Sequence, residues 1–293
     1  MPARGSRRAS PVSSEFGLIR RLQAQAAKPD RQVALGIGDD TAILKTSPTE
    51  WTLMTTDLLA EGVHFDLATS SCEDIGYRAA IANLSDIAAM GGTPRFMLVA
   101  IAIPSTCSTT QIQQLYRGMM QASAPYQVCL VGGDTSASKH GLFLSITLTG
   151  VVRPGHALLR SEARVGDRLY VTGTLGDSRA GLGLLSSRRQ HSFASTHRRF
   201  LLARHHRPSA RIAEGRNVYD AGFEIVSLAY GQRRATLFQR IGACNETPLL
   251  CDLLAQVLLR PAVLPVGVVT ACIGAPFFVA LLLSRGLRAR LWS

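Results

Sequence analysis

The first half of the chain carries apolar residues at two different spacings. In Cys72–Met90 and Thr110–Ala122 they recur with the period of a helix, which predicts two helices, and a shorter amphipathic helix is predicted to begin near Glu15. Phe96–Pro104 is apolar throughout and Leu142–Gly150 alternates, and both patterns are typical of strands. The first half therefore contains regular elements of both kinds.

Other predicted strands lead into polar residues. The apolar run Val128–Val131 stops at Gly132-Gly133-Asp134, which predicts a buried strand followed by a tight loop. The strand from Trp51 is predicted to end at Thr55-Thr56-Asp57, and two short strands flank Asp39-Asp40. The resulting order of strands and helices predicts an α/β domain with mixed strand pairing.

These polar residues suggest a phosphate site that uses a cation. Backbone N–H groups of a glycine loop can approach a phosphate, but Asp134 would repel it unless Mg²⁺ lies between them. Asp86 lies in an otherwise apolar helix, where a carboxylate is costly unless it is paired or bound to a metal. The adjacent Asp39 and Asp40 fit a solvated turn as well as a cation site. His64 by itself also fits a structural histidine.

Composition and charge argue against several classes of function. The 293 residues are enough for two domains. The net charge of +12 comes from the second half, where basic residues are not interleaved with aromatic ones, so no binding to nucleic acid is expected. The six cysteines form no C-x-x-C pair and are expected to be free thiols in a reducing compartment. No apolar segment follows the N-terminal arginines, so we expect no secretory signal peptide and a cytoplasmic location.

Several motifs occur together in a known order and spacing, namely Gly38-Asp39-Asp40, Thr55-Thr56-Asp57, Glu61–Phe65, Asn83–Gly91, Gly132–Thr135, Arg160–Gly173, Leu175–Leu182 and Arg207–Arg211. On these motifs, the chain from about residue 15 to 215 resembles the thiamine-monophosphate kinases. The resemblance implies the N-terminal α/β domain of the aminoimidazole-ribotide-synthetase-like ATP-binding superfamily. It also implies transfer of the γ-phosphoryl group of ATP to thiamine monophosphate, which gives thiamine diphosphate.

The same resemblance implies roles for individual residues. His64 would contact thiamine monophosphate. ATP, as the second substrate, would contact Tyr116, Gly133, Asp134 and Arg160. The implied ligands of the cofactor Mg²⁺ are Asp39, Thr55, Thr56, Asp57, Asp86 and Asp134. If Asp57 and Asp134 share an ion, their carboxylates should lie within one metal-bridged distance.

The resemblance further implies a homodimer formed through the N-terminal domain. In the related enzymes the two sheets join across a two-fold axis. The strand at Leu142–Val152 is therefore expected to find a partner sheet rather than to form an open edge.

The resemblance fails beyond Arg211. The family continues with an Asp-x-Ser-Asp-Gly-Leu motif, whereas this chain has Val218–Glu224, so we expect a truncated second domain and impaired activity. The expected boundaries are a disordered tail at 1–14, an ATP- and metal-binding domain at 15–152, the start of a second α/β domain at 153–215, a connecting segment at 216–241 and a hydrophobic tail at 242–293.

The C-terminal tail resembles the last helices of the iron-siderophore and vitamin B12 family of ABC-transporter permeases. Pro261–Ser284 carries no charged side chain and would be about 36 Å long as a helix, enough to cross a membrane. The arginines that follow would lie in the cytoplasm, although Pro265 and Pro276 also fit a broken, buried segment. Contact with a membrane through 261–284 is thus expected. An alternative function stays open, namely a non-catalytic permease fragment fused to a kinase remnant.

Overall fold

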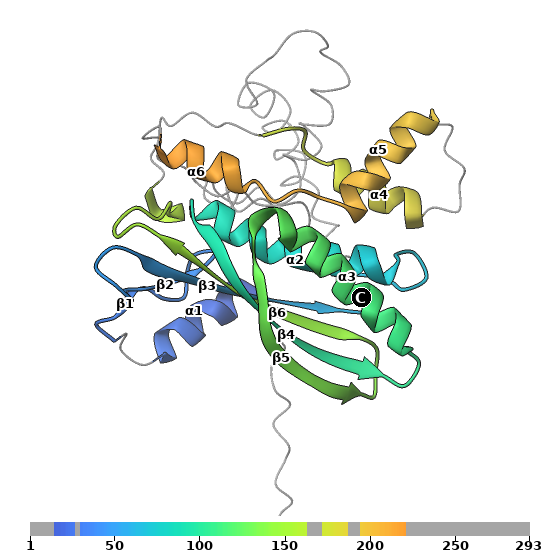
Figure 1. The fold of residues 1–293 in the computed structure, drawn as a ribbon, viewed down its shortest axis with the longest axis horizontal. Coiled ribbons are helices and arrows are strands. Elements are labelled where there is room, and N and C mark those ends of the chain that lie inside the picture. The colour runs from blue at the N-terminus through green and yellow to red at the C-terminus, as the bar shows by residue number, and fades with distance from the viewer. Residues whose placement is uncertain (1–14, 27–29, 163–171, 187–193, 221–293) are drawn as a thin grey trace, which may run out of the picture.

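The computed structural model describes residues 15–26, 30–162, 172–186 and 194–220 of the chain (Figure 1). The tail predicted at 1–14 and the segment predicted at 242–293 lie outside these residues. The elements are α1 (Glu15–Gln25), β1 (Val33–Leu35), β2 (Ala42–Leu44), β3 (Trp51–Ala60), α2 (Cys72–Ala89), β4 (Thr93–Pro104), α3 (Thr109–Ser123), η1 (Ala124–Tyr126), β5 (Cys129–Ser138), β6 (Phe143–Val152), η2 (Arg160–Glu162), α4 (Asp177–Ser186), α5 (Ser195–His206) and α6 (Ile212–Asp220).

The strands form one six-stranded sheet in the order β1-β2-β3-β6-β4-β5. All neighbours are antiparallel except β4 and β5, which are parallel, so the predicted mixed α/β domain is confirmed. The expectation that Leu142–Val152 joins a partner's sheet is wrong. This segment is β6, which pairs with β3 on one side and β4 on the other, so all its ladder hydrogen bonds are used inside the sheet.

The predicted loop at Gly132-Gly133-Asp134 is also wrong, because β5 continues in register with β4 as far as Ser138. A Cβ atom on Gly133 would lie 1.8 Å from the carbonyl oxygen of Val99, so glycine is needed for the close approach of two strands and not for a turn. The ladder shifts between Met97 and Leu98, which marks a bulge beside the glycine pair. β5 is an exposed edge strand and not the predicted buried one.

Helices α2 and α3 cover one face of the sheet, as Figure 1 shows. β6 alternates along its whole length, and the side chains of Leu144, Ile146 and Leu148 on its covered face are buried. α2 begins where the Ser71 hydroxyl accepts the N–H of Asp74, and it ends before Gly91, whose φ of 68° belongs to the left-handed region. The two long helices predicted from the sequence are confirmed.

Two glycines set the distance between α2 and α3. A Cβ atom on Gly76 would lie 1.9 Å from the carbonyl oxygen of Leu115, and one on Gly118 would lie 1.8 Å from that of Glu73. Backbone therefore meets backbone at this crossing, which no larger residue would allow. α2 therefore packs against the sheet on one side and against α3 on the other.

Beyond the sheet, α4, α5 and α6 lie over α2 on the side away from the strands (Figure 1). α6 approaches α2 closely, since a Cβ atom on Gly215 would lie 2.2 Å from the carbonyl oxygen of Ala88. α6 runs across the boundary predicted at residue 215. The described residues after 153 contain helices and no strand, and 163–171 lie outside the description, so the predicted second α/β domain stays a prediction.

The other face of the sheet is not covered by α2 and α3. Alternate residues of β3 and β4 point to it, among them Met54, Leu58, Phe96 and Leu98, which are 40%, 56%, 52% and 44% exposed. Apolar side chains of this size seldom gather on a surface that meets only water.

Candidate functional site

Asp39 and Asp40 share one arginine. The backbone N–H of Arg160 donates to Asp39 Oδ2 at 3.0 Å, and its guanidinium Nε lies 3.4 Å from Asp39 Oδ1 and 3.3 Å from Asp40 Oδ2. Burial raises the pKa of Asp39, while the N–H groups of Asp40 and Arg160 act in the opposite direction. In place of the solvated turn considered for Asp39 and Asp40, the structure shows a partly buried carboxylate pair beside the Arg160 guanidinium.

Thr55 and Asp86 form a second polar pair. The Thr55 hydroxyl donates to Asp86 Oδ2 at 2.6 Å across the interface between β3 and α2. Thr56 points to the opposite face of the sheet, where its hydroxyl donates to the carbonyl of Ile146 at 3.1 Å. The structure thus brings Thr55 and Asp86 together and does not bring the Thr56 hydroxyl to them.

Tyr116, Gly133 and Asp134 line one hollow of about 400 Å³ between α3 and the edge strand β5. A volume of this size suits a small ligand. Burial raises the pKa of Tyr116, so its phenol stays protonated at neutral pH. Arg160, the fourth residue implied to bind ATP, is not among the lining residues, which also include Val99, Leu130, Gly132 and Thr135.

The sharing of one ion by Asp57 and Asp134 stays a prediction. Asp57 lies opposite Ile146 on β6, and Asp134 lies opposite Ala100 on β4. β6 and β4 both separate β3 from β5, so three strand spacings, or about 14 Å along a flat sheet, lie between the two positions. Sheets are twisted, so this backbone spacing does not give the distance between the two carboxylates.

The described residues contain no group of three or more His, Cys, Asp and Glu side chains placed around one point. The donors nevertheless suit a hard cation, because Asp39, Thr55 and Asp86 offer only oxygen atoms. Next to Asp39-Asp40, the hydroxyl oxygen of Thr41 is buried and has no hydrogen-bond partner among the described residues. The partly buried carboxylates of Asp39 and Asp40, which already attract the Arg160 guanidinium, fit Mg²⁺.

His64 lies in the loop after β3. Its Nδ1 accepts the backbone N–H of Ala60 at 3.0 Å, so in the neutral ring the proton is on Nε2. An Nε2–H group is a donor of the kind that a phosphate oxygen accepts. The guanidinium of Arg78 donates to the carbonyl oxygen of His64 and fixes the loop from behind.

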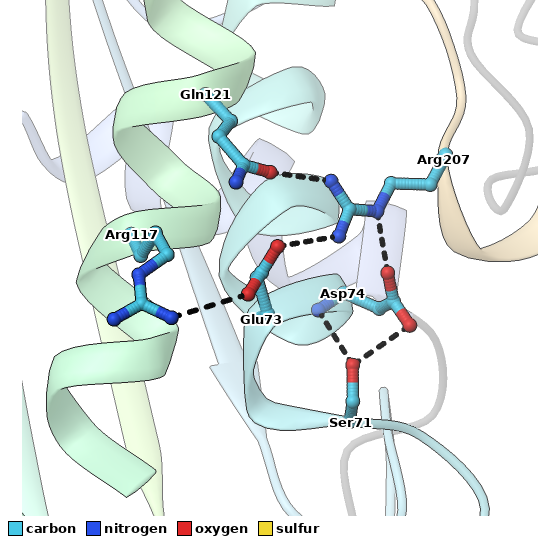
Figure 2. A network of polar contacts seen from close by, with 6 residues as sticks. All are labelled: Ser71, Glu73, Asp74, Arg117, Gln121 and Arg207. Carbon is cyan, nitrogen blue, oxygen red and sulfur yellow. Dashed lines mark hydrogen bonds and ion pairs between the residues drawn. The ribbon is translucent and has the colours of Figure 1, made fainter. Parts of the chain in front are cut away.

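A cluster around Arg207 was not recognised from the sequence (Figure 2). Its guanidinium donates to Glu73 Oε1 at 2.9 Å and to Gln121 Oε1 at 2.6 Å, and it also pairs with Asp74. The same group stacks 4.9 Å from the ring centre of Tyr77. The cluster joins the residue after α5 to both α2 and α3. The Arg207–Arg211 motif gave its position but not its partners.

A comparison with known protein families identifies the class of protein. A model of the AIR synthase related protein, N-terminal domain, matches residues 38–152. This range begins at the glycine before Asp39 and ends with β6, so it includes the two oxygen-rich pairs and the hollow described above. The fold is that of an AIR-synthase-like domain.

The relatives then identify the family, and the chain belongs to the thiamine-monophosphate kinases. It is 39% identical to the Bacillus subtilis thiamine-monophosphate kinase over 69% of this chain and 62% of that protein. It is 35% identical to the one from Synechococcus elongatus over 83% of this chain and 68% of that protein. The chain thus spans about two thirds of the length of these relatives.

Solved structures agree with this assignment. A structure described as AaThiL complexed with AMPPCP and TMP is 35% identical, with a TM-score of 0.62 over 70% of this chain and 62% of the other. The thiamine monophosphate kinase from Aquifex aeolicus is 32% identical, with a TM-score of 0.56 over 69% and 64%.

A second family model, that of the FecCD transport family, matches residues 231–284. This range lies outside the described residues, as does the apolar stretch 261–284. Among the residues that are described, no helix is both long and apolar enough to span a bilayer.

Proposed function

We propose that the chain is an ATP-dependent kinase that phosphorylates thiamine monophosphate to thiamine diphosphate in the cytoplasm. The relatives named thiamine-monophosphate kinase support the reaction, and AaThiL has been solved with AMPPCP and TMP. The observation that carries the proposal is the shared hollow, in which Tyr116, Gly133 and Asp134 come together from α3 and β5.

In this reaction the chain's residues bind and orient two anions. Tyr116 forms one wall of the ATP site, and Gly133 leaves backbone exposed to the phosphates. Arg160 would turn away from Asp39 and Asp40 and contact ATP. The phosphate of the acceptor is already ionised at neutral pH, so no strong general base is needed.

Mg²⁺, when bound, supplies charge neutralisation between the two substrates. Asp39, Thr55 and Asp86 would hold it on one side, and Asp57 and Asp134 would provide further ligands. The Thr56 hydroxyl is left out of the ligand set, since it points to the other face of the sheet.

Thiamine monophosphate would be held by His64. Its Nε2–H donates to the phosphate of this substrate, and the hydrogen bond from Ala60 to Nδ1 keeps the ring in the required tautomer.

We further propose a homodimer that buries the open face of the sheet. The apolar side chains of Met54, Leu58, Phe96 and Leu98 gather there, and a second copy offers the same face across a two-fold axis. Face-to-face packing replaces the edge-to-edge pairing expected from the sequence, because β6 is a central strand.

The ATP site is tested by calorimetric titration with ATP and Mg²⁺. Replacing Tyr116 by Ala should weaken the affinity about tenfold, since an aromatic wall is lost. Phe200→Ala, which removes an exposed aromatic ring from α5, is the matched control and should change nothing. Equal affinities for wild type and Tyr116→Ala would reject the hollow as the ATP site. Absence of ATP binding in the wild type would favour the non-catalytic alternative suggested by the FecCD match at 231–284.

A further inference from the structure

A buried hydrogen bond links α2 to α5. The side chains of Arg78 and His205 are 4% and 2% exposed, and Arg78 Nη1 lies 2.8 Å from His205 Nε2. A guanidinium can only donate, so His205 Nε2 accepts and the ring is neutral. The proton on Nδ1 then faces the hydroxyl oxygen of Ser178, 3.3 Å away on α4.

The second arm of the same guanidinium reaches the loop that carries His64. Nη2 of Arg78 donates to the carbonyl oxygen of His64. Within that loop, the N–H of Gly62 donates to the carbonyl of Phe65 at 2.8 Å, and the N–H of Ala60 donates to the His64 ring. The carbonyl and the ring of one residue are thus each held by one hydrogen bond, and a rotation of its backbone would disturb both.

We propose that Arg78 is a positioning residue that aims the His64 ring at the substrate phosphate, and that His205 on α5 holds Arg78 in the required orientation. The inference rests on the proposed function, in which His64 contacts thiamine monophosphate. It makes the helices after residue 172 part of the acceptor site although none of their side chains needs to touch the acceptor.

Attachment of α5 to the first domain does not by itself require this contact. Arg207 already binds Glu73, Asp74 and Gln121, and its described partners lie on α2 and α3 and not in the His64 loop (Figure 2). A buried cation is costly to keep without partners on every side. The acceptors of Arg78 include one on α5 and one in the loop, so removing the first is expected to loosen the second.

The test compares three variants of the full chain. His205→Leu removes the acceptor, His205→Gln keeps an acceptor, and Arg207→Gln weakens the attachment of α5 without touching the loop. Hydrogen exchange is measured for the amide of Ala60, which donates to the His64 ring. Affinities for thiamine monophosphate and for ATP with Mg²⁺ are measured by calorimetry.

We expect faster exchange at Ala60 in His205→Leu only, together with about tenfold weaker binding of thiamine monophosphate, equivalent to about 1.4 kcal/mol. ATP affinity should stay within about twofold, and His205→Gln should behave like the wild type. If His205→Leu does not fold, Arg78→Lys takes its place, because an ammonium group cannot reach both acceptors.

Unchanged exchange at Ala60 in His205→Leu would overturn the proposal, as would an equal loss of affinity for both ligands. The same loop effect in Arg207→Gln would reduce Arg78 to a structural role and overturn it as well. A wild-type chain that binds no thiamine monophosphate would instead reject the proposed function, and the exchange at Ala60 would still decide whether Arg78 holds the loop.

Discussion

At the scale of single residues, the direction in which a side chain points decides its role. Thr55 and Thr56 are neighbours in sequence and chemically identical, yet one meets Asp86 under α2 and the other meets the carbonyl of Ile146 on the open face. Charged side chains that are buried or partly buried follow the same logic. Asp86 has Thr55 as a partner, and Arg78 has His205 and the His64 loop.

The two threonines give a matched pair for Mg²⁺ binding. Thr55→Val is expected to weaken Mg²⁺-dependent ATP binding about tenfold, because it removes the partner that orients Asp86. Thr56→Val should change the affinity by less than about twofold. Titration calorimetry with ATP at fixed Mg²⁺ measures both, and a larger loss for Thr56→Val would show that both faces of β3 contribute ligands.

His205 predicts a pH dependence of stability. Burial, the charge of Arg78 and the neighbouring His206 lower the pKa of His205 from 6.5 to about 4, although a hydrogen bond that the ring donates to Ser178 acts in the opposite direction. The unfolded state therefore binds the proton more readily, so this stabilisation is present above pH 6.5 and is lost as the pH falls towards 4. The full effect is on the order of 3 kcal/mol.

Urea unfolding of the wild type and of His205→Gln across this pH range measures the contribution. Burial also lowers the pKa of His206, so only the difference between the two proteins reports on His205. The wild type should lose more stability than the variant on acidification, and parallel curves would contradict the assignment.

At the scale of elements, close approach of backbones shapes the domain. Gly76 and Gly118 let α2 meet α3, and Gly133 lets β5 follow β4. The C-terminal part of α5 then docks on the N-terminal half of α2 through Arg207, and α6 docks on its C-terminal end through Gly215. α2 is thus the helix on which the sheet, α3 and the later helices all depend.

Substituting one of these glycines should separate the helices. Gly118→Ala is expected to destabilise the fold by about 2–3 kcal/mol, because its Cβ would lie 1.8 Å from the Glu73 carbonyl oxygen. Gly183→Ala in α4 is the control, since nothing lies within 4 Å of its Cβ, and it should stabilise by about 0.5–1 kcal/mol. Denaturant unfolding of the two variants measures both changes in stability. Equal stabilities would show that α2 and α3 can shift apart freely.

At the scale of the whole molecule, two features bear on assembly and on activity. The open face of the sheet exposes large apolar side chains, and the second half of the acceptor site has no recognisable Asp-x-Ser-Asp-Gly-Leu motif after Arg211. The exposed apolar face favours a homodimer. The missing motif favours weak catalysis.

The dimer is tested with one charge on the open face. Leu58→Asp should convert the dimer to a monomer, because a carboxylate buried between two apolar faces is costly. Phe200→Asp changes an equally exposed apolar residue, 51% against 56%, on α5 and should leave the dimer intact. Light scattering after gel filtration, with 31.5 kDa per chain, gives the mass. A wild-type monomer would refute the interface.

Catalysis should be slow even if both substrates bind. Loss of groups that align donor and acceptor is expected to cost at least about 4 kcal/mol, or about 10³-fold in turnover, relative to an intact enzyme. Thiamine diphosphate formation at saturating ATP and Mg²⁺ measures it. Turnover in the ordinary range of about 1–10³ s⁻¹ would show that residues after 215 supply the missing contacts.

The sequence by itself determined the main helices and strands of the first domain, and the family. Helical and alternating periodicities placed α2, α3 and β6, because burial of an apolar face is a local pattern. The motifs at Asp39, Asp57, Asp86 and Asp134 were enough to recognise the kinases, and the apolar neighbours of Asp86 alone indicated that its carboxylate needs a partner.

The tertiary structure alone decided which of these residues meet. Gly132-Gly133 gives the same local signal for a loop and for a strand that approaches another, and only the pairing with β4 distinguishes them. The position of β6 between β3 and β4 means that Leu142–Val152 has no free edge to offer to a second copy. Contacts such as Arg78 with His205 join positions far apart in the chain, and no local pattern encodes them because they depend on how the later helices pack over α2.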